Sequence, residues 1–272
     1  MSYLSYLTGA VSPQTRSKIY WLFSDSFIFI KRSLKHIRKN PDQLIGLITQ
    51  PIMFMLLFRY VFGGAIDPGN TTYVNFLIAG ILVQTSAFGA STTSFSVALD
   101  MQRGVIDRIK SLPIASTSLL LGHVTADLVR NLLSGIIMIL VALLVGFRPE
   151  ATVGDWLAVT GLLLLFTFAV SWLSAILGLL AKTIEAVQWI SFLLIFPLTF
   201  ASAAFAPTDT MAPGLRWFAE NQPITHVIEA IRALMIDTPV GNHITLSIIW
   251  FTAITIISIP VATFLYRRHS GR

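Results

Sequence analysis

Apolar residues dominate several long stretches of the chain, and short polar or charged segments separate these stretches. A helix needs about 20 predominantly apolar residues to cross the hydrocarbon core of a bilayer. Because lipid offers the backbone no hydrogen-bond partners, spanning segments of this kind are expected to be helices. The pattern therefore predicts an all-α polytopic membrane protein with six transmembrane helices, over residues 44–63, 74–97, 118–147, 156–181, 187–206 and 244–266.

The segment that precedes the first span has two parts. Residues 1–16 are polar to mixed, and we expect a flexible N-terminus there. Over residues 17–40, apolar side chains recur every three or four positions and cations crowd the second half, which is typical of an amphipathic helix in the lipid headgroup layer. Its apolar run is too short for a span. Residues 17–272 are thus expected to form a single transmembrane domain, with Pro51 and Pro197 as kinks in the first and fifth spans.

A charged segment, DMQRGVIDRIKSLPIA, lies between the second and third spans, from Asp100 to Ala115. Val105, Ile106, Ile109 and Leu112 are spaced so that a helix would carry one apolar stripe and one charged face. Pro113 would end that helix, since proline lacks the amide and restricts the residue before it. The segment therefore predicts a short amphipathic helix at the membrane surface, suited to docking. A charge-rich connecting loop is the alternative.

The segment between the fifth and sixth spans, residues 207–243, is too long for a simple turn. It contains two short helical patterns, at 213–220 and 224–235. In the second, Glu229 precedes Arg232 by three residues, a spacing that permits an ion pair. The sequence does not decide whether these helices lie on the surface or dip back into the bilayer.

The distribution of lysine and arginine predicts how the chain is oriented in the membrane. In membrane proteins they concentrate in cytoplasmic loops. Six spans put both termini, the segment 100–115 and the turn at Lys182 on one side, where most of the basic residues lie. The other side then holds only Arg59, Arg148, Arg216 and Arg232. We therefore expect a multi-pass protein of the plasma membrane with both termini in the cytoplasm.

Composition narrows the function. Charged residues make up 12% of the chain and its mean hydropathy is +0.74, whereas soluble domains carry about 25% charged residues. The net charge of +6 follows from topology and does not call for a nucleic-acid partner. The chain has no cysteine, no metal-binding motif, and neither a nucleotide-binding GxxxxGK[ST] loop nor a GxSxG or HExxH motif. We expect no enzyme activity and no directly bound cofactor.

Two sets of side chains in the spans, one ionisable and one aromatic, each leave two interpretations open. His123, Asp127 and Arg130 either pair locally or form a proton relay, which would make the protein a secondary, proton-coupled transporter. Aromatic side chains at helical spacing either pack the bundle or line an apolar path for cargo; these are Phe54, Phe58, Phe88 and Phe95.

Three strings, in this order along the chain, carry a family resemblance: RGVIDRIKSLPIA, FAPTDTMAPGLRWFAE and NQPITHVIEAIRAL. Together with the order of the spans, they resemble the membrane subunit of type-2 ABC exporters, in the daunorubicin-resistance (DrrB-like) branch. The resemblance covers almost the whole chain after about Ser17. One departure is Asp107, where many members carry Glu.

The resemblance implies a permease subunit that exports a hydrophobic or amphiphilic compound, such as a drug, a polyketide or a lipid-linked molecule. ATP and Mg²⁺ would bind to a separate ABC ATP-binding subunit, and the permease would pair with a second copy or a sister permease in membrane lipid. The implied ATPase-coupling residues are Arg103, Gly104, Asp107, Arg108, Leu112, Pro113, Lys182 and Glu185. The implied outer-helix motif comprises Asn221, Pro223, Thr225, Glu229 and Arg232.

Overall fold

The computed structural model describes residues 41–66, 69, 71–105, 118–181 and 183–268. The expected flexible N-terminus and interface helix, at 1–16 and 17–40, lie outside the described residues, as do residues 106–117 and Lys182. Within the described ranges all regular structure is helical, which confirms the all-α prediction. The elements are α2 (Pro41–Leu57), η1 (Phe58–Phe62), α3 (Tyr73–Gln102), α5 (Ser118–Val145), α6 (Val153–Leu180), α7 (Ile184–Phe200), η2 (Thr208–Thr210), α8 (Pro213–Asn221), α9 (Pro223–Met235) and α10 (His243–Arg268).

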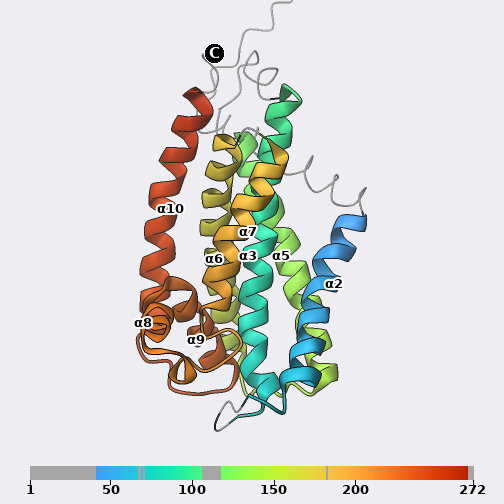
Figure 1. The fold of residues 1–272 in the computed structure, drawn as a ribbon, viewed down its shortest axis with the longest axis vertical. Helices are drawn as coiled ribbons and strands as arrows, with labels where there is room; N and C mark the ends of the chain where they lie inside the picture. The colour runs from blue at the N-terminus through green and yellow to red at the C-terminus, as the bar shows by residue number, and fades with distance from the viewer. Residues whose placement is uncertain (1–40, 67–68, 70, 106–117, 182, 269–272) are drawn as a thin grey trace, which may run out of the picture.

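Helix α3 forms the centre of the bundle. It packs against α2, α5, α6, α7 and α9, and its side chains are buried along most of its length. Helix α10 flanks the bundle on one side and α2 on the other (Figure 1). Helices α8 and α9 lie at the end opposite the C-terminus. That end also carries the turns that follow η1 and α5, so alternate connections fall on alternate sides.

Threonine side chains set the start of three helices. Thr72, Thr152 and Thr183 each accept a hydrogen bond from the backbone N–H three residues later, at 3.4, 3.4 and 3.1 Å. The first backbone N–H groups of a helix have no partner inside it, and a hydroxyl at this position supplies one. These polar residues therefore fix where the apolar helices α3, α6 and α7 begin.

Some of the helices are shorter than the spans predicted from the sequence. Among the described residues, four helices are long and apolar enough to cross a membrane: α3, α5, α6 and α10. The apolar helical segments Thr49–Phe62 and Ile184–Phe200 are shorter. Helix α7 has 17 residues and so extends about 25 Å at 1.5 Å per residue, somewhat less than the ~30 Å of a hydrocarbon core.

The fifth predicted span is not helical to its end. The fifth span was expected to run to Ala206, but the helix ends at Phe200 and residues 201–206 form turns. The physical reason lies in α9, whose side chains bind the backbone of this segment, as described below. The structure does place Pro51 and Pro197 inside α2 and α7.

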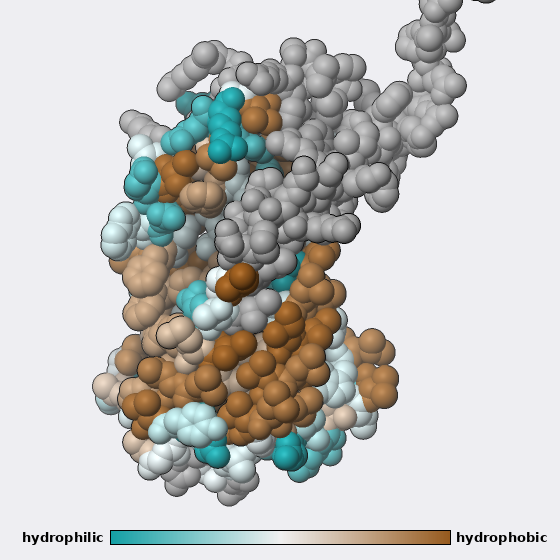
Figure 2. Space-filling model, turned by 90° about the vertical axis from the view of Figure 1, so that its right-hand side faces the viewer, coloured by the Kyte–Doolittle hydropathy of each residue, from teal (hydrophilic) through white to brown (hydrophobic). Residues whose placement is uncertain are grey.

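The outward face of α5 is suited to lipid. Leu133, Ile136, Leu140 and Leu144 recur at steps of three or four and are exposed. Figure 2 views the molecule from the side of α2 and α5, and a broad hydrophobic surface covers its lower half, with polar residues at the lower edge. In water such a surface would be unfavourable, whereas in a bilayer it meets hydrocarbon.

The central crossing of α3 and α6 depends on Gly178. A Cβ atom there would lie 2.4 Å from the carbonyl oxygen of Ser94, so the two helices would have to separate. Overpacking of this kind costs about 1–3 kcal/mol, and we expect Gly178→Ala to lower the thermal unfolding temperature in detergent. The matched control is Gly161→Ala on the same helix, where a Cβ meets nothing within 4 Å. Equal unfolding temperatures for the two variants would contradict this account of the crossing.

Candidate functional site

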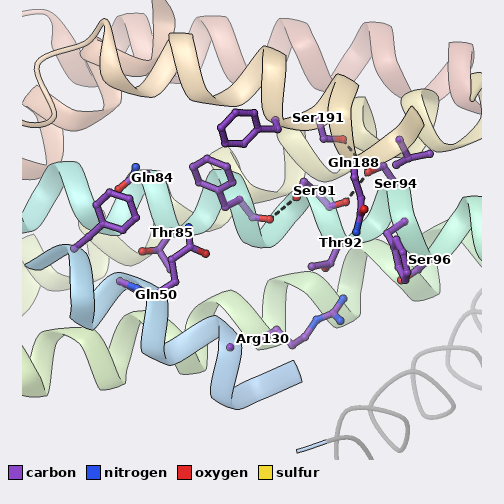
Figure 3. A pocket seen from close by; sticks show the side chains of 17 residues that line it. Gln50, Gln84, Thr85, Ser91, Thr92, Ser94, Ser96, Arg130, Gln188 and Ser191 are labelled. Carbon is purple, nitrogen blue, oxygen red and sulfur yellow. Dashed lines mark hydrogen bonds between the residues drawn. The ribbon is translucent and has the colours of Figure 1, made fainter. Parts of the chain in front are cut away.

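A cavity of about 520 Å³ lies among α2, α3, α5 and α7. That volume is in the range of small-molecule sites. Its polar wall consists largely of hydroxyl and amide side chains of α3, joined by Gln50 from α2, Arg130 from α5, and Gln188 and Ser191 from α7. Figure 3 shows that these residues are spread along the cavity, with Gln84 towards one end and Ser96 towards the other.

Phenylalanine rings form the apolar wall. Phe54, Phe88 and Phe95, three of the four residues expected to line a path, lie on the cavity wall together with Phe192. Phe58 is not on that wall; its ring packs between Phe54 and Phe205, with centroids 6.2 and 4.4 Å away. The sequence analysis missed Phe192. Its signal was the spacing of four between Phe192, Phe196 and Phe200, whose rings stack in succession at 5.0 and 4.2 Å.

A buried carboxylate stands behind the cavity. Asp127 of α5 is fully buried and pairs with Arg130 one turn later on the same helix. Thr92 donates a hydrogen bond to its Oδ1 at 2.7 Å, and Thr93 and Ser171 donate to its Oδ2, Ser171 at 3.4 Å. The carboxylate thus joins α3, α5 and α6. In a low-dielectric interior a charge with this many partners is held far more firmly than an isolated one.

A second polar pair joins α3 and α5 near the C-terminal end of α3. His123 Nε2 lies 2.9 Å from the Oδ2 atom of Asp100, a residue of the last turns of α3. Together with Asp127–Arg130, this contact gives each of the three ionisable groups a partner, and the partner of His123 lies on a different helix. The sequence analysis missed Asp100 as the partner of His123, because no local spacing links residues on different helices.

Only some of the expected coupling residues fall within the described ranges. Arg103 directly follows α3, and Gly104 has φ +64°, a left-handed conformation that glycine adopts without strain. Glu185 lies in the exposed first turn of α7. The ends of α3 and α7 that carry these residues lie at the same end of the bundle (Figure 1). Asp107, Arg108, Leu112, Pro113 and Lys182 lie outside the described residues.

At the other end, α8 and α9 match the two predicted helical patterns. Helix α9 is buried against α3, α6 and α10, so it packs into the bundle and does not lie on its surface. The expected pair of Glu229 and Arg232 forms, with Oε1 and Nη1 2.5 Å apart. Asn221, by contrast, is exposed and donates to the carbonyl of Trp217 at 2.7 Å, at the end of α8. Pro223 begins α9.

Arg232 makes long-range contacts that sequence spacing did not predict. Its Nε donates to the carbonyl of Phe76 on α3 at 3.0 Å, its Nη2 donates to the carbonyl of Ala203, and its guanidinium lies 3.6 Å from the centre of the Phe76 ring. Only 5% of the residue is exposed. One buried cation therefore ties α9 both to the central helix and to the segment after α7.

Polar side chains of α9 and its N-cap explain why α7 ends early. Thr225 accepts a hydrogen bond from the N–H of Ala203 at 3.3 Å, and Gln222 donates to the carbonyl of Ala201. The hydroxyl of Tyr73 donates to the carbonyl of Phe205 at 3.0 Å. Buried backbone groups outside a helix need such partners. Side chains of Thr225, Gln222 and Tyr73 therefore supply partners for backbone groups of residues 201–206 that no longer lie in a helix.

Two histidines face each other where α9 meets α10. The Nδ1 atoms of His226 and His243 are 3.2 Å apart, so one ring donates and the other accepts. Burial is the main cause that lowers the pKa of His226, and the neighbouring His243 adds to it. The unfolded chain therefore takes up a proton at higher pH than the folded protein does.

This pair predicts a pH dependence of stability. The contribution of His226 is complete above the ordinary histidine pKa of about 6.5 and decreases as the pH falls through and below that value. We expect the unfolding temperature to fall between pH 7.5 and pH 5, and His226→Gln to reduce that fall. The fall is measured by thermal unfolding in detergent at both pH values. His243→Gln, which changes the other member of the pair, is measured in the same way. An identical fall in wild type and His226→Gln would show that the pair has no such role.

No group of three or more His, Cys, Asp or Glu side chains that could hold a metal ion occurs among the residues that the structure describes.

Sequence comparisons show which known proteins this chain is similar to. The sequence pattern of the family described as ABC-2 type transporter matches residues 25–236. Daunorubicin resistance ABC transporter permease protein DrrB1 of Streptomyces coeruleorubidus is 30% identical over 243 residues, which cover 88% of this chain and 85% of that protein. Probable doxorubicin resistance ABC transporter permease protein DrrC of Mycobacterium tuberculosis is 26% identical over 268 residues, covering 95% and 94%. Inner membrane transport permease YadH of Escherichia coli K12 is 23% identical over 218 residues, covering 79% and 83%.

Proposed function

The chain belongs to the ABC-2 type transporter family, and on that premise we propose that it is the permease subunit of an ATP-driven exporter of a hydrophobic or amphiphilic compound. Two of its relatives are named as ABC transporter permease proteins, one for daunorubicin resistance and one for doxorubicin resistance. The observation that carries the proposal for this chain is the cavity among α2, α3, α5 and α7, which has an aromatic wall and a hydroxyl-rich wall.

Six segments would span the plasma membrane in this arrangement. Helices α3, α5, α6 and α10 are long enough by themselves. Helix α2 continues through η1 to Phe62, and α7 would be supplemented by residues 201–206, which are packed inside the protein. Both termini would be cytoplasmic. Helices α8 and α9 would then lie on the outer side, with α9 re-entering the bundle.

Energy would come from a separate ABC ATP-binding subunit, which binds ATP and Mg²⁺. The permease would contact it through the segment from Arg103 to Pro113, with the turn at Lys182 to Glu185 as a second, smaller contact. A movement at that surface would be transmitted to α3 and α5, which flank the segment and also line the cavity. A second copy of the chain, or a sister permease, would complete the pathway.

Co-purification tests this proposal. We expect the tagged full-length chain, expressed with a candidate ABC ATP-binding protein from the same genome, to retain that protein through purification in detergent. The complex should hydrolyse ATP, whereas the chain by itself should not. Purification of the chain without any ATP-binding protein, from membranes that contain both, would argue against the proposal.

The buried carboxylate of Asp127 favours a second candidate, a proton-coupled carrier that uses His123, Asp127 and Arg130. Both the histidine and the carboxylate already have partners, so proton uptake would have to break an existing contact. For such a carrier, substitution of the three residues should abolish transport without affecting folding. Normal export by a folded triple variant would exclude this candidate.

A further inference from the structure

Arg130 stands out on the wall of the cavity. Among the described residues that line the cavity, it is the one charged side chain; the polar groups around it are neutral amides and hydroxyls. In Figure 3 its side chain extends from α5 towards Thr92 of α3, at the end of the cavity away from Gln84. A charged side chain in a membrane-spanning helix is unfavourable, and such residues commonly have a function.

The two members of the Arg130–Asp127 ion pair differ in how far they are exposed. The Asp127 side chain has no exposed surface, whereas 12% of the Arg130 side chain is exposed. The carboxylate accepts hydrogen bonds from the hydroxyl groups of Thr92 and Thr93 on α3 and of Ser171 on α6. The pair therefore presents its positive member to the cavity and keeps its negative member behind the wall.

The guanidinium also retains hydrogen-bonding capacity. Its Nη2 donates to Asp127, and its Nε is buried without a hydrogen-bond partner within the described part of the chain. Guanidinium groups bind carboxylates and phosphates through paired N–H donors, and a second anion can share the group with the first. The fixed carboxylate orients the guanidinium, so a ligand would not bear the whole cost of ordering the side chain.

From these observations we propose that Arg130, held by Asp127, is an anion-binding subsite of the cavity. The cargo would be an amphiphile whose acidic group, a carboxylate or phosphate, binds Arg130 while its apolar body lies against Phe54, Phe88 and Phe192. This inference rests on the proposed export function and adds to it the class of cargo. An exported acidic compound and an anionic lipid headgroup share this chemistry.

Binding of matched fluorescent probes tests the subsite. The full-length chain is placed in nanodiscs of phosphatidylcholine, and 1-pyrenebutyric acid and its methyl ester are titrated at pH 8, with empty nanodiscs subtracted. We expect Arg130→Gln to weaken binding of the acid about tenfold or more, the scale of a charge-assisted hydrogen bond, and to change binding of the ester less than about twofold. Arg130→Lys should retain part of the preference for the acid. The matched control, Arg148→Gln, removes an arginine between α5 and α6, away from the cavity lining, and should leave binding of both probes unaffected.

Three results would overturn the subsite: no saturable binding of either probe, wild type that binds acid and ester alike, or a preference for the acid that survives Arg130→Gln. Co-purification with the ATP-binding protein tests the exporter proposal, and probe binding tests the subsite. Because the two are measured separately, failure of one proposal is distinguishable from failure of the other. A further arm adds phosphatidylglycerol to the nanodiscs. Competition in wild type that disappears in Arg130→Gln would identify the lipid headgroup as a ligand, and its absence would leave the acidic compound as the cargo.

Discussion

Replacing Asp127 with alanine is expected to destabilise the protein more than any other single substitution considered for it. The change leaves the guanidinium of Arg130 without its counter-ion in the membrane interior and removes the acceptor of hydrogen bonds from Thr92, Thr93 and Ser171. Removing one partner of a buried ion pair costs about 3–5 kcal/mol. We expect a large loss of monodisperse protein on extraction and a much lower unfolding temperature in detergent.

Two further variants separate charge from packing. Asp127→Asn keeps an acceptor oxygen for the hydroxyl groups but not the charge. Its unfolding temperature should therefore lie between those of wild type and Asp127→Ala. The double variant Asp127→Ala with Arg130→Met removes both charges, and removal of a whole buried pair is often nearly neutral. It should therefore recover most of the stability while losing the preference for the acidic probe. A double variant as unstable as Asp127→Ala would contradict this account of the pair.

The second large effect is expected in the segment between α3 and α5. Asp107→Ala combined with Arg108→Ala removes an acidic and a basic side chain from the proposed contact with the ATP-binding subunit. A few charged and well-packed residues usually carry most of the energy of an interface. We expect the amount of co-purified ATP-binding subunit, or the transport coupled to each ATP hydrolysed, to fall about tenfold or more while the permease still folds.

The chain offers a matched control for this double variant. Arg216 and Glu220 form an ion pair on α8 at 2.7 Å, with both side chains well exposed. Removing both also deletes one acidic and one basic residue, but at the opposite end of the bundle. Exposed pairs contribute little to stability. Association and coupling should therefore be unchanged, and a loss as large as that of the Asp107 and Arg108 variant would argue against the segment 100–115 as the contact.

Local spacing predicted a good part of this fold. The periodicity over 213–220 and 224–235 predicted two helices, and the separation of three residues predicted the Glu229–Arg232 pair; the structure contains both. The long apolar stretches likewise predicted helices, because hydropathy is a property of neighbouring residues. Starts fixed by a threonine, as at Thr72 and Thr183, fall within a few residues of the predicted boundaries.

Contacts between distant segments were not predictable in this way. The run from Val187 to Ala206 is predominantly apolar and contains no glycine or charged residue, so nothing in it indicated that the helix stops at Phe200. The stop depends on Gln222, Thr225 and Arg232, which lie at the start of α9 and within it. The partners of His123 and His226 also lie on other helices. The cavity is formed in the same manner, because Phe192 reaches Phe88 across two helices, with ring centroids 6.5 Å apart.

Transport in proteoliposomes tests most directly whether the permease is driven by contact with a separate ATP-binding subunit. Inside-out vesicles would contain the full-length chain with or without that subunit, and accumulation of 1-pyrenebutyrate would be followed on addition of ATP or on imposing a proton gradient. The account predicts accumulation only with both subunits and ATP, and none from a proton gradient. Accumulation driven by a proton gradient in vesicles that contain the chain alone would contradict it.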